Sequence, residues 1–158
     1  MIKILFVCHG NICRSPMAEF IMKDLAKKAG LEDQLQIASA ATSTEEIGNP
    51  VYPPARRKLQ ELGIDCTGKT ARRLTAEDYG RCDLLIGMDQ ANLRNMRRIC
   101  GGDPEGKVHL LMEFADRPQQ EVADPWYTGD FDRACGDILT GCQALLEEIR
   151  QHRGELRR

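Results

Sequence analysis

"IKILFVCHGNICRSP", residues 2–16, joins an apolar run to a short loop and then to the start of a helix. Residues 2–8 are almost all apolar and include β-branched and aromatic side chains, which is typical of a strand buried on both faces. Ser15 is a favourable N-cap, and Pro16 suits the first helical position. We therefore predict a strand over residues 2–8 and a helix that follows Ser15 and ends at Gly30.

The rest of the chain repeats this alternation of apolar strand and amphipathic helix. We expect three further strands, at residues 34–40, 82–88 and 107–114. We expect helices at residues 53–62, 90–99 and 131–152, with Asp89 as the N-cap of the second. We also expect a short turn with a capping box of Thr75 and Asp78, and a polar loop over residues 115–130. This order favours an α/β fold, with a parallel sheet covered by helices on both faces. In such sheets ligands bind beyond the carboxyl ends of the strands, which is where the first loop lies.

The composition limits the kind of protein. Of its 158 residues 42% are hydrophobic, so the chain can form one domain over residues 1–158 with a substantial core. Its 22 basic and 24 acidic residues are balanced, which disfavours a nucleic-acid-binding surface. No apolar run reaches the roughly 18 residues of a membrane-spanning helix, and the N-terminus lacks the pattern of a signal peptide. We expect a cytoplasmic protein that binds no nucleic acid and does not insert into membranes.

Seven cysteines are scattered along the chain without a C-x-x-C pair, and the three histidines lie far apart. This pattern is neither a disulfide framework nor a zinc site, so we expect no bound metal. In a reducing compartment most of these cysteines are expected to be small buried hydrophobic residues: Cys66, Cys82, Cys100, Cys135 and Cys142. Cys8, at the end of the first predicted strand, needs a separate explanation.

The loop after Cys8 has the composition of a phosphate-binding loop. Gly10 and Asn11 readily adopt positive backbone φ angles, so the loop can curl and turn successive N–H groups inward. With the positive end of the next helix, these groups can hold a tetrahedral dianion, and the planar fork of Arg14 can bind two of its oxygens. The same field stabilises a thiolate, so Cys8 is expected to be a nucleophile at neutral pH. Ser15 can support the sulfur by donating a hydrogen bond.

Phosphoryl transfer to sulfur also needs an acid that protonates the leaving oxygen. Asp124, within ADPWYTGDF, is the favoured candidate because Pro125 stiffens its backbone. Trp126 and Tyr127 can form a wall for an aromatic leaving group. The pattern supports equally the alternative that Asp124 only opens a turn and that the two aromatic side chains pack under it.

Two signatures now resemble one family. VCHGNICRSPMAE near the N-terminus and DPWYTGDF in the last third, with GMDQANL between them, are similar to the low-molecular-weight protein tyrosine phosphatases. The resemblance covers essentially the whole chain. It implies a flavodoxin-like three-layer sandwich with a central four-stranded parallel sheet. It also implies a protein-tyrosine-phosphatase without metal or other cofactor, which hydrolyses aryl phosphates through a cysteinyl-phosphate intermediate.

The resemblance assigns roles to individual residues. Cys8 becomes the nucleophile, Arg14 the residue that binds phosphate and stabilises the transition state, and Asp124 the general acid and later the base. Asn11 matches the asparagine that holds the loop in shape, and Cys13 a neighbouring cysteine that can trap oxidised Cys8 as a disulfide, or a small side chain that only fills the loop's underside. The expected phosphate-binding loop comprises His9, Gly10, Asn11, Ile12, Cys13, Arg14 and Ser15.

The chain departs from the family pattern around the pocket. His9 stands where a small or medium apolar residue is usual, which places either a titratable group at the mouth of the loop or a solvent-facing side chain without effect. Glu45 stands where many members of the family carry an aromatic residue that forms one wall of the pocket, unless Tyr52 or another side chain supplies that wall. Lys69 replaces a common histidine that supports the loop. Trp126 and Tyr127 match the family's aromatic pair, so Glu45, Trp126 and Tyr127 are the expected pocket residues.

Other functions compete with this interpretation. An arsenate reductase of the same fold needs a relay of nearby cysteines, but no cysteine follows Cys82 within a dozen residues. A non-catalytic phosphopeptide-binding module would not need both a nucleophile and an acid, and activity on a small phosphorylated metabolite stays open. We expect a tyrosine-phosphorylated protein as substrate, inorganic phosphate as product, and a monomer or weak dimer.

Overall fold

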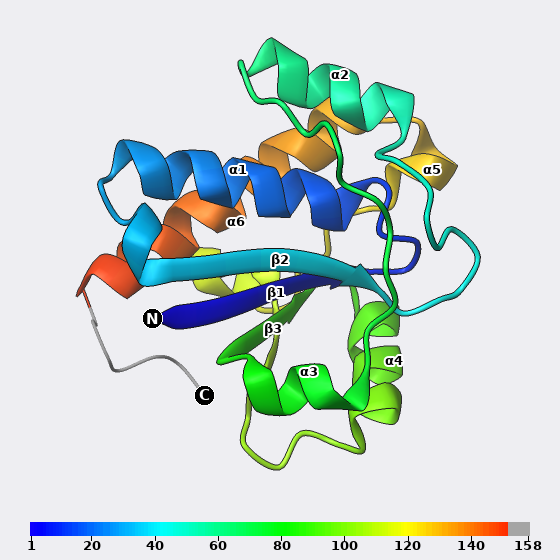
Figure 1. The fold of residues 1–158 in the computed structure, drawn as a ribbon, viewed down its shortest axis with the longest axis vertical. Coiled ribbons are helices and arrows are strands. Elements are labelled where there is room, and N and C mark those ends of the chain that lie inside the picture. Colours follow the sequence, from blue (N-terminus) through cyan, green and yellow to red (C-terminus); the bar gives the residue numbers. More distant parts are fainter. Residues whose placement is uncertain (152–158) are drawn as a thin grey trace.

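The computed structural model describes residues 1–151, and a four-stranded parallel sheet forms its centre (Figure 1). The strand order is β2-β1-β3-β4, with every neighbouring pair parallel. The strands are β1 (Ile2–Cys8), β2 (Leu35–Ala41), β3 (Leu84–Gly87) and β4 (Val108–Leu110). The predicted α/β fold with four parallel strands is confirmed. The predicted end of the last helix at His152 lies outside the described residues.

Helices cover both faces of this sheet (Figure 1). One face carries α1 (Arg14–Lys28) and α6 (Phe131–Gln151), with α2 (Pro53–Glu61) and the short α5 (Pro125–Thr128) near their ends at the carboxyl edge of the sheet. The other face carries α3 (Ala76–Arg81) and α4 (Gln90–Cys100). Two 3-10 turns, η1 (Glu32–Gln34) and η2 (Leu111–Ala115), complete the elements.

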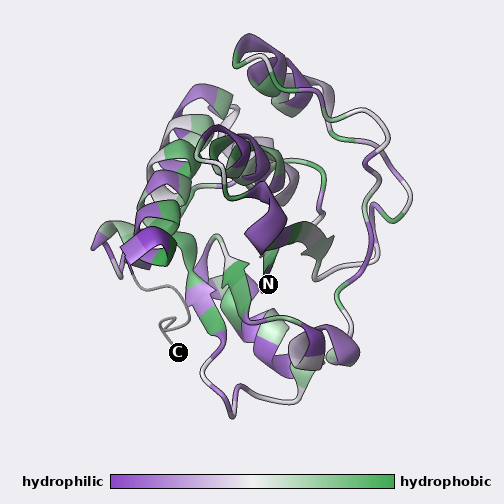
Figure 2. Ribbon diagram, turned by 60° about the vertical axis from the view of Figure 1, so that its left-hand side comes forward, coloured by the Kyte–Doolittle hydropathy of each residue, from purple (hydrophilic) through white to green (hydrophobic). Residues whose placement is uncertain are grey.

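Side chains of β1 alternate between two cores, one on each side of the sheet. Ile4, Phe6 and Cys8 belong to the larger core under α1 and α6, while Leu5 and Val7 belong to the core under α3 and α4. The longer helices accordingly carry apolar residues on one side and polar residues on the other (Figure 2). This alternation directs the Cys8 side chain toward α1 at the carboxyl edge of the sheet. No helix within residues 1–151 is long and apolar enough to cross a membrane.

The predicted strand over residues 107–114 is wrong in its second half. The strand ends at Leu110, because the Glu113 carboxylate accepts a hydrogen bond from the Leu110 N–H at 2.9 Å and closes a 3-10 turn. This turn packs tightly on α6, since a Cβ atom at Gly141 would stand only 2.5 Å from Cγ of Leu111. The short apolar run is therefore shared between a strand and a turn, which apolar content alone does not distinguish.

Two neighbouring expectations also need correction. The capping box of Thr75 and Asp78 opens a six-residue helix, α3, where only a turn was expected. Cys82 follows α3 as its C-terminal cap, so the predicted strand over residues 82–88 begins only at Leu84. Among the cysteines expected in the core, three are buried and two, Cys82 and Cys100, are only partly buried.

Candidate active site

A cavity of about 90 Å³ opens at the carboxyl edge of the sheet, directly beyond β1. Most of the residues expected at the site line it: Cys8, His9, Gly10, Ile12, Cys13, Arg14, Glu45, Asp124, Trp126 and Tyr127. Glu46 lines it too and was not anticipated. Asn11 and Ser15, expected in the phosphate-binding loop, have side chains behind the loop, where they hold it in place. Three segments that are far apart in the sequence thus meet at one small cavity.

The thiol of Cys8 lies at the base of this cavity and is only 3% exposed. Its Sγ is 3.0 Å from Oγ of Ser15 and 3.4 Å from the Ser15 backbone nitrogen. Because this hydroxyl faces the sulfur, the prediction that Ser15 caps the helix is wrong. The helix α1 begins one residue earlier, at Arg14, with Cys13 as an N-cap that makes no side-chain hydrogen bond. In the first turn of α1, the Ser15 backbone N–H donates to the sulfur at 3.4 Å.

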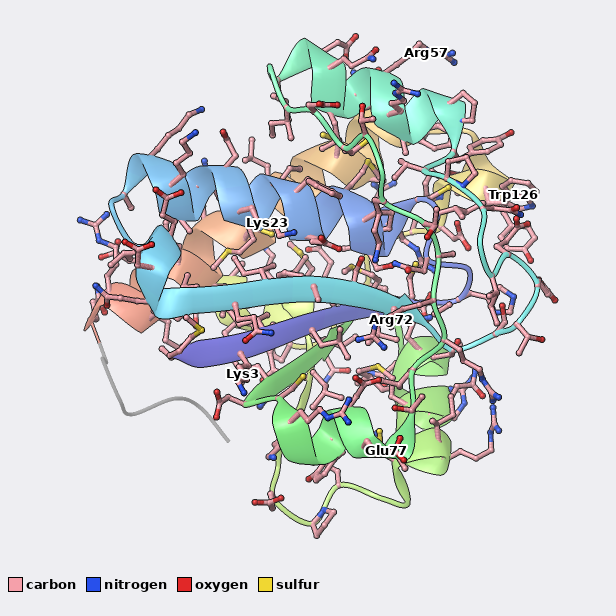
Figure 3. The ribbon with its side chains drawn as sticks, in the orientation of Figure 1. Lys3, Lys23, Arg57, Arg72, Glu77 and Trp126 are labelled. Carbon is pink, nitrogen blue, oxygen red and sulfur yellow. The ribbon has the colours of Figure 1, made fainter. Side chains whose placement is uncertain are left out.

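Asn11 fixes the shape of the loop. Its φ angle is +59°, in the left-handed region that asparagine tolerates better than most residues. Its Nδ2 donates to Oγ of Ser15 at 2.7 Å and to Oγ of Ser39 at 2.9 Å, while its Oδ1 accepts from the Arg72 backbone N–H at 3.2 Å. Figure 3 shows Arg72 beside the carboxyl end of β2. The amide thus ties the loop to β2 and to the segment that follows α2.

A polar chain continues inward from Ser39. The Ser39 hydroxyl donates to Oε1 of the buried Glu19 at 2.5 Å. Lys69 donates to the Ser39 carbonyl at 3.0 Å, and its Nζ lies 3.4 Å from the Glu19 carboxylate. Burial lowers the pKa of Lys69, although Glu19 opposes this effect. Lys69 thus supports the loop indirectly, through Ser39 and Asn11.

Arg14 is 98% buried and has three partners. Its Nη1 donates to Oδ2 of Asp89 at 2.7 Å and to the Val122 carbonyl at 2.8 Å, and its Nη2 lies 3.3 Å from Oδ2 of Asp124. Burial by itself lowers the pKa of this guanidinium, but Cys8, Asp89 and Asp124 raise it above its ordinary value. Arg14 therefore remains a cation held in a fixed orientation. Sequence reasoning assigned Asp89 only to the cap of α4.

Asp124 opens a turn, as one of the two alternatives predicted, and its carboxyl group also lines the cavity. Its Oδ1 accepts from the Trp126 backbone N–H at 3.0 Å, so the residue caps the short helix α5. Its Oδ2 faces Arg14 in the cavity. The segment before it is anchored by Val122, whose N–H donates to the Met88 carbonyl at 2.8 Å. A carboxyl group thus stands over the thiol cavity on a short, capped turn.

The mouth of the cavity has one aromatic and one charged side. Trp126 is half exposed and Tyr127 is 82% exposed, so they do not pack under the turn. Opposite them, Nε2 of His9 lies 3.0 Å from Oε2 of Glu45. The ring of Tyr52 stands behind Trp126, with 4.8 Å between centroids, and does not line the cavity. Tyr52 therefore packs behind Trp126. It does not supply an aromatic wall on the side of the pocket where Glu45 stands.

Cys13 lies inside the loop, beside the cavity, and is buried. Burial, with the nearby Cys8 and Asp124, raises the pKa of its thiol to about 12. Within residues 1–151 no three His, Cys, Asp or Glu side chains form a group that could hold a metal ion.

The fold and the cavity together define an α/β protein with a buried thiol and a buried arginine at one anion-sized cavity. The sequence profile of the family Low molecular weight phosphotyrosine protein phosphatase matches residues 3–155. The chain belongs to this family. The predicted family and the predicted enzyme class are thereby confirmed.

Three relatives illustrate the similarity. The low molecular weight protein-tyrosine-phosphatase YfkJ of Bacillus subtilis is 40% identical over 97% of this chain and 99% of its own length. Its crystal structure superimposes with a TM-score of 0.92 over 96% of both chains, at 39% identity. The Rattus norvegicus enzyme of the family is 36% identical over 92% of this chain and 94% of its own. Vibrio vulnificus Wzb in complex with benzylphosphonate gives a TM-score of 0.81 at 27% identity, over 93% and 98% of the two chains.

Proposed function

We propose that this chain is a protein-tyrosine-phosphatase that hydrolyses phosphotyrosine and other aryl phosphates through a cysteinyl-phosphate intermediate, without a metal ion. One observation carries the proposal: Cys8, Arg14 and Asp124 line the same cavity, with the Ser15 hydroxyl 3.0 Å from the sulfur. The complex of Vibrio vulnificus Wzb with benzylphosphonate, a phosphonate joined to an aromatic ring through a methylene group, supports an aryl phosphate as the ligand class.

In the first step the Cys8 thiolate attacks phosphorus, and the bond between phosphorus and the aryl oxygen breaks. Asp124, in its acid form, donates its proton to that oxygen, so the alcohol leaves neutral. Arg14 binds the phosphoryl group through the guanidinium N–H groups that Asp89 and Val122 leave free, and offsets charge in the transition state. Backbone N–H groups of the loop, from His9 to Ser15, are proposed to bind the remaining oxygens.

In the second step water attacks the phosphocysteine. The Asp124 carboxylate takes a proton from this water, the bond between sulfur and phosphorus breaks, and inorganic phosphate leaves. The Ser15 hydroxyl donates a hydrogen bond to the departing thiolate, keeps its own proton, and makes the sulfur a better leaving group. The enzyme returns to its starting state, with a thiolate at Cys8 and a protonated Asp124.

The decisive experiment is hydrolysis of p-nitrophenyl phosphate between about pH 5 and 8, with a chelator present and under reducing conditions. Cys8→Ser should abolish turnover, and Asp124→Ala should reduce kcat by about 10²–10⁴-fold, the usual contribution of general acid catalysis. Cys100→Ser is the matched control, because it alters a partly buried thiol outside the cavity and should keep the parent rate. An inactive parent, or an active Cys8→Ser enzyme, would favour the non-catalytic binding module.

The physiological substrate is proposed to be a tyrosine-phosphorylated protein. The expected cytoplasmic location, the single domain over residues 1–158 and the monomeric or weakly dimeric state stay predictions.

A further inference from the structure

A second groove, of about 530 Å³, runs beside the catalytic cavity. It lies between the start of α2 and the aromatic turn of α5. Its walls are mainly apolar and include Val51, Tyr52 and Pro53, and its outer end carries Arg56 and Arg57. Figure 3 shows Arg57 projecting outward from α2 and Trp126 projecting from α5.

The groove is continuous with the catalytic cavity. Ile12, Glu46 and Trp126 line both. The backbone N–H of Tyr52 donates to the Ile12 carbonyl at 2.9 Å, so the floor of the groove is fixed to the loop that carries the nucleophile. A polypeptide whose phosphorylated side chain enters the cavity can therefore continue along this groove, across the Trp126 ring.

The outer end of the groove is positively charged. Arg56 and Arg57 are both exposed, and neither lies within ion-pair distance of a carboxylate in the described part of the chain. The adjacent Lys58 differs, because Glu61 and Asp132 hold it in place. Glu46, at the cavity end, accepts from the Asn49 side chain at 2.6 Å. Within residues 1–151, the groove thus has one carboxylate near the cavity and two guanidinium groups farther out that form no ion pair, although Arg56 is near enough to Asp65 to help lower the pKa of that carboxyl group.

The position of the arginines limits which residue of a substrate can reach them. Arg56 and Arg57 follow Tyr52, the N-cap of α2, by four and five residues, which corresponds to about 6–8 Å along a helix. An extended peptide advances about 3.3 Å per residue, so the span from Tyr52 to the arginines takes about two residues, to which the residues between the phosphotyrosine and Tyr52 are added.

We propose that this groove binds the segment beside phosphotyrosine in the protein substrate, and that Arg56 and Arg57 select acidic side chains about two to four residues away from it. The inference rests on the proposed function and adds a substrate class to it: acidic phosphotyrosine sequences. Charge complementarity and continuity with the cavity are the grounds for this occupant.

The test compares phosphotyrosine peptides that carry glutamate or glutamine two to four residues from the phosphotyrosine, with separate series for its N-terminal and C-terminal sides. At low ionic strength the parent should prefer glutamate in one series by about three- to tenfold in kcat/KM, the range of two exposed ion pairs. Arg56→Gln/Arg57→Gln should lose this preference. Arg97→Gln/Arg98→Gln, which removes two exposed arginines near the far end of α4, should keep it. About 0.5 M salt should weaken it in the parent.

Hydrolysis of p-nitrophenyl phosphate, which does not reach the groove, separates the possible outcomes. If the parent hydrolyses this compound but does not distinguish the peptides, or if both double variants lose the preference equally, the groove is not a substrate site and the proposed function stands. If the parent does not hydrolyse it under reducing conditions, the proposed function itself fails. Sedimentation velocity at rising concentration tests the other occupant: a dimer that Arg56→Gln/Arg57→Gln abolishes would assign the groove to a second copy and overturn the proposal.

Discussion

The Asp89 carboxylate holds Arg14 and α4 at the same time. Its Oδ2 accepts from Nη1 of Arg14 at 2.7 Å, while its Oδ1 accepts from the Asn92 backbone N–H at 2.7 Å and caps the helix. A residue that sequence patterns identify only as a helix cap thus also orients the guanidinium over the thiol.

Asp89→Asn should separate these two tasks. Asparagine caps helices as well as aspartate does, so the melting temperature should change little. Arg14 loses its closest anionic partner, and the resulting misorientation should lower kcat/KM for p-nitrophenyl phosphate by about ten- to a hundredfold. Asp89→Ala, the comparison, should lose the cap as well, at about 1 kcal/mol of stability. Unchanged kcat/KM in Asp89→Asn would show that Val122 and Asp124 suffice to orient Arg14.

Asn11 contributes both its backbone conformation and its amide. Asn11→Gly keeps access to a positive φ angle but removes the hydrogen bonds to Ser15, Ser39 and Arg72, so kcat/KM and stability should both fall. Asn11→Ala should be less stable still, by about 1–2 kcal/mol, because alanine resists the left-handed region. Urea unfolding of the two variants measures the difference. Equal stabilities would mean that the loop relaxes to another conformation.

Glu45 leaves one side of the pocket without an aromatic wall. Glu45→Trp should lower KM for p-nitrophenyl phosphate by about two- to tenfold, the range expected for one aromatic stacking contact. Glu45→Gln is the control, since it removes the negative charge beside His9 without adding aromatic surface. If both variants lower KM equally, repulsion between Glu45 and the dianion, and not missing stacking area, sets the affinity.

The Asp78 carboxylate should contribute stability that depends on pH. Burial by itself would raise its pKa, but hydrogen bonds from Arg72 and Thr75 hold it below its usual value. The contribution is therefore complete above the unfolded pKa of about 3.9 and is lost as the pH falls through the lower folded value. Asp78→Ala should cost about 1–3 kcal/mol at pH 7 and much less near pH 2. Glu77→Ala, a change at an exposed neighbour, should show no such dependence. A constant cost would argue against the ion pair.

Cys13 should be unreactive despite its place beside the nucleophile. With a pKa of about 12, its thiolate is almost absent at pH 7.5. Brief treatment with iodoacetamide, followed by mass spectrometry, should modify Cys8 in the parent and leave Cys13 unmodified in Cys8→Ser. Inorganic phosphate should protect Cys8 by filling the cavity. Labelling of Cys13 in Cys8→Ser would contradict the burial that raises its pKa.

Sequence patterns predicted the parts of this molecule that depend on near neighbours. The strand that ends at Cys8, the loop and the following helix lie within one short stretch, so their geometry follows from local preferences. Two roles were predicted for Ser15: its hydroxyl contacts the Cys8 sulfur, as expected, but it does not cap α1, whose N-cap is Cys13. The strand predicted through Phe114 was too long, because the Glu113 side chain closes a turn that an apolar run does not reveal.

The parts that could not be predicted are contacts between distant segments. Arg14 meets Asp89 and the Val122 carbonyl across 75 and 108 residues, and Ser39 meets Glu19 across the interface of β2 and α1. Such pairs depend on how the sheet brings its carboxyl ends together, and an isolated carboxylate in a sequence gives no sign of its partner. Glu46 was missed for the same reason, since only the folded loop turns it toward the cavity.

The backbone of Val122 holds the segment that carries Asp124 in position for a small substrate. Its N–H donates to the carbonyl of Met88, directly after β3, and its carbonyl accepts from Arg14, so contacts within the protein hold the segment that carries Asp124. Binding then need not supply the free energy to close a flexible lid over the thiol. A molecule that offers little more than one ring and one phosphate meets a site that is already preorganised, and the rest of a protein substrate is free to determine selectivity.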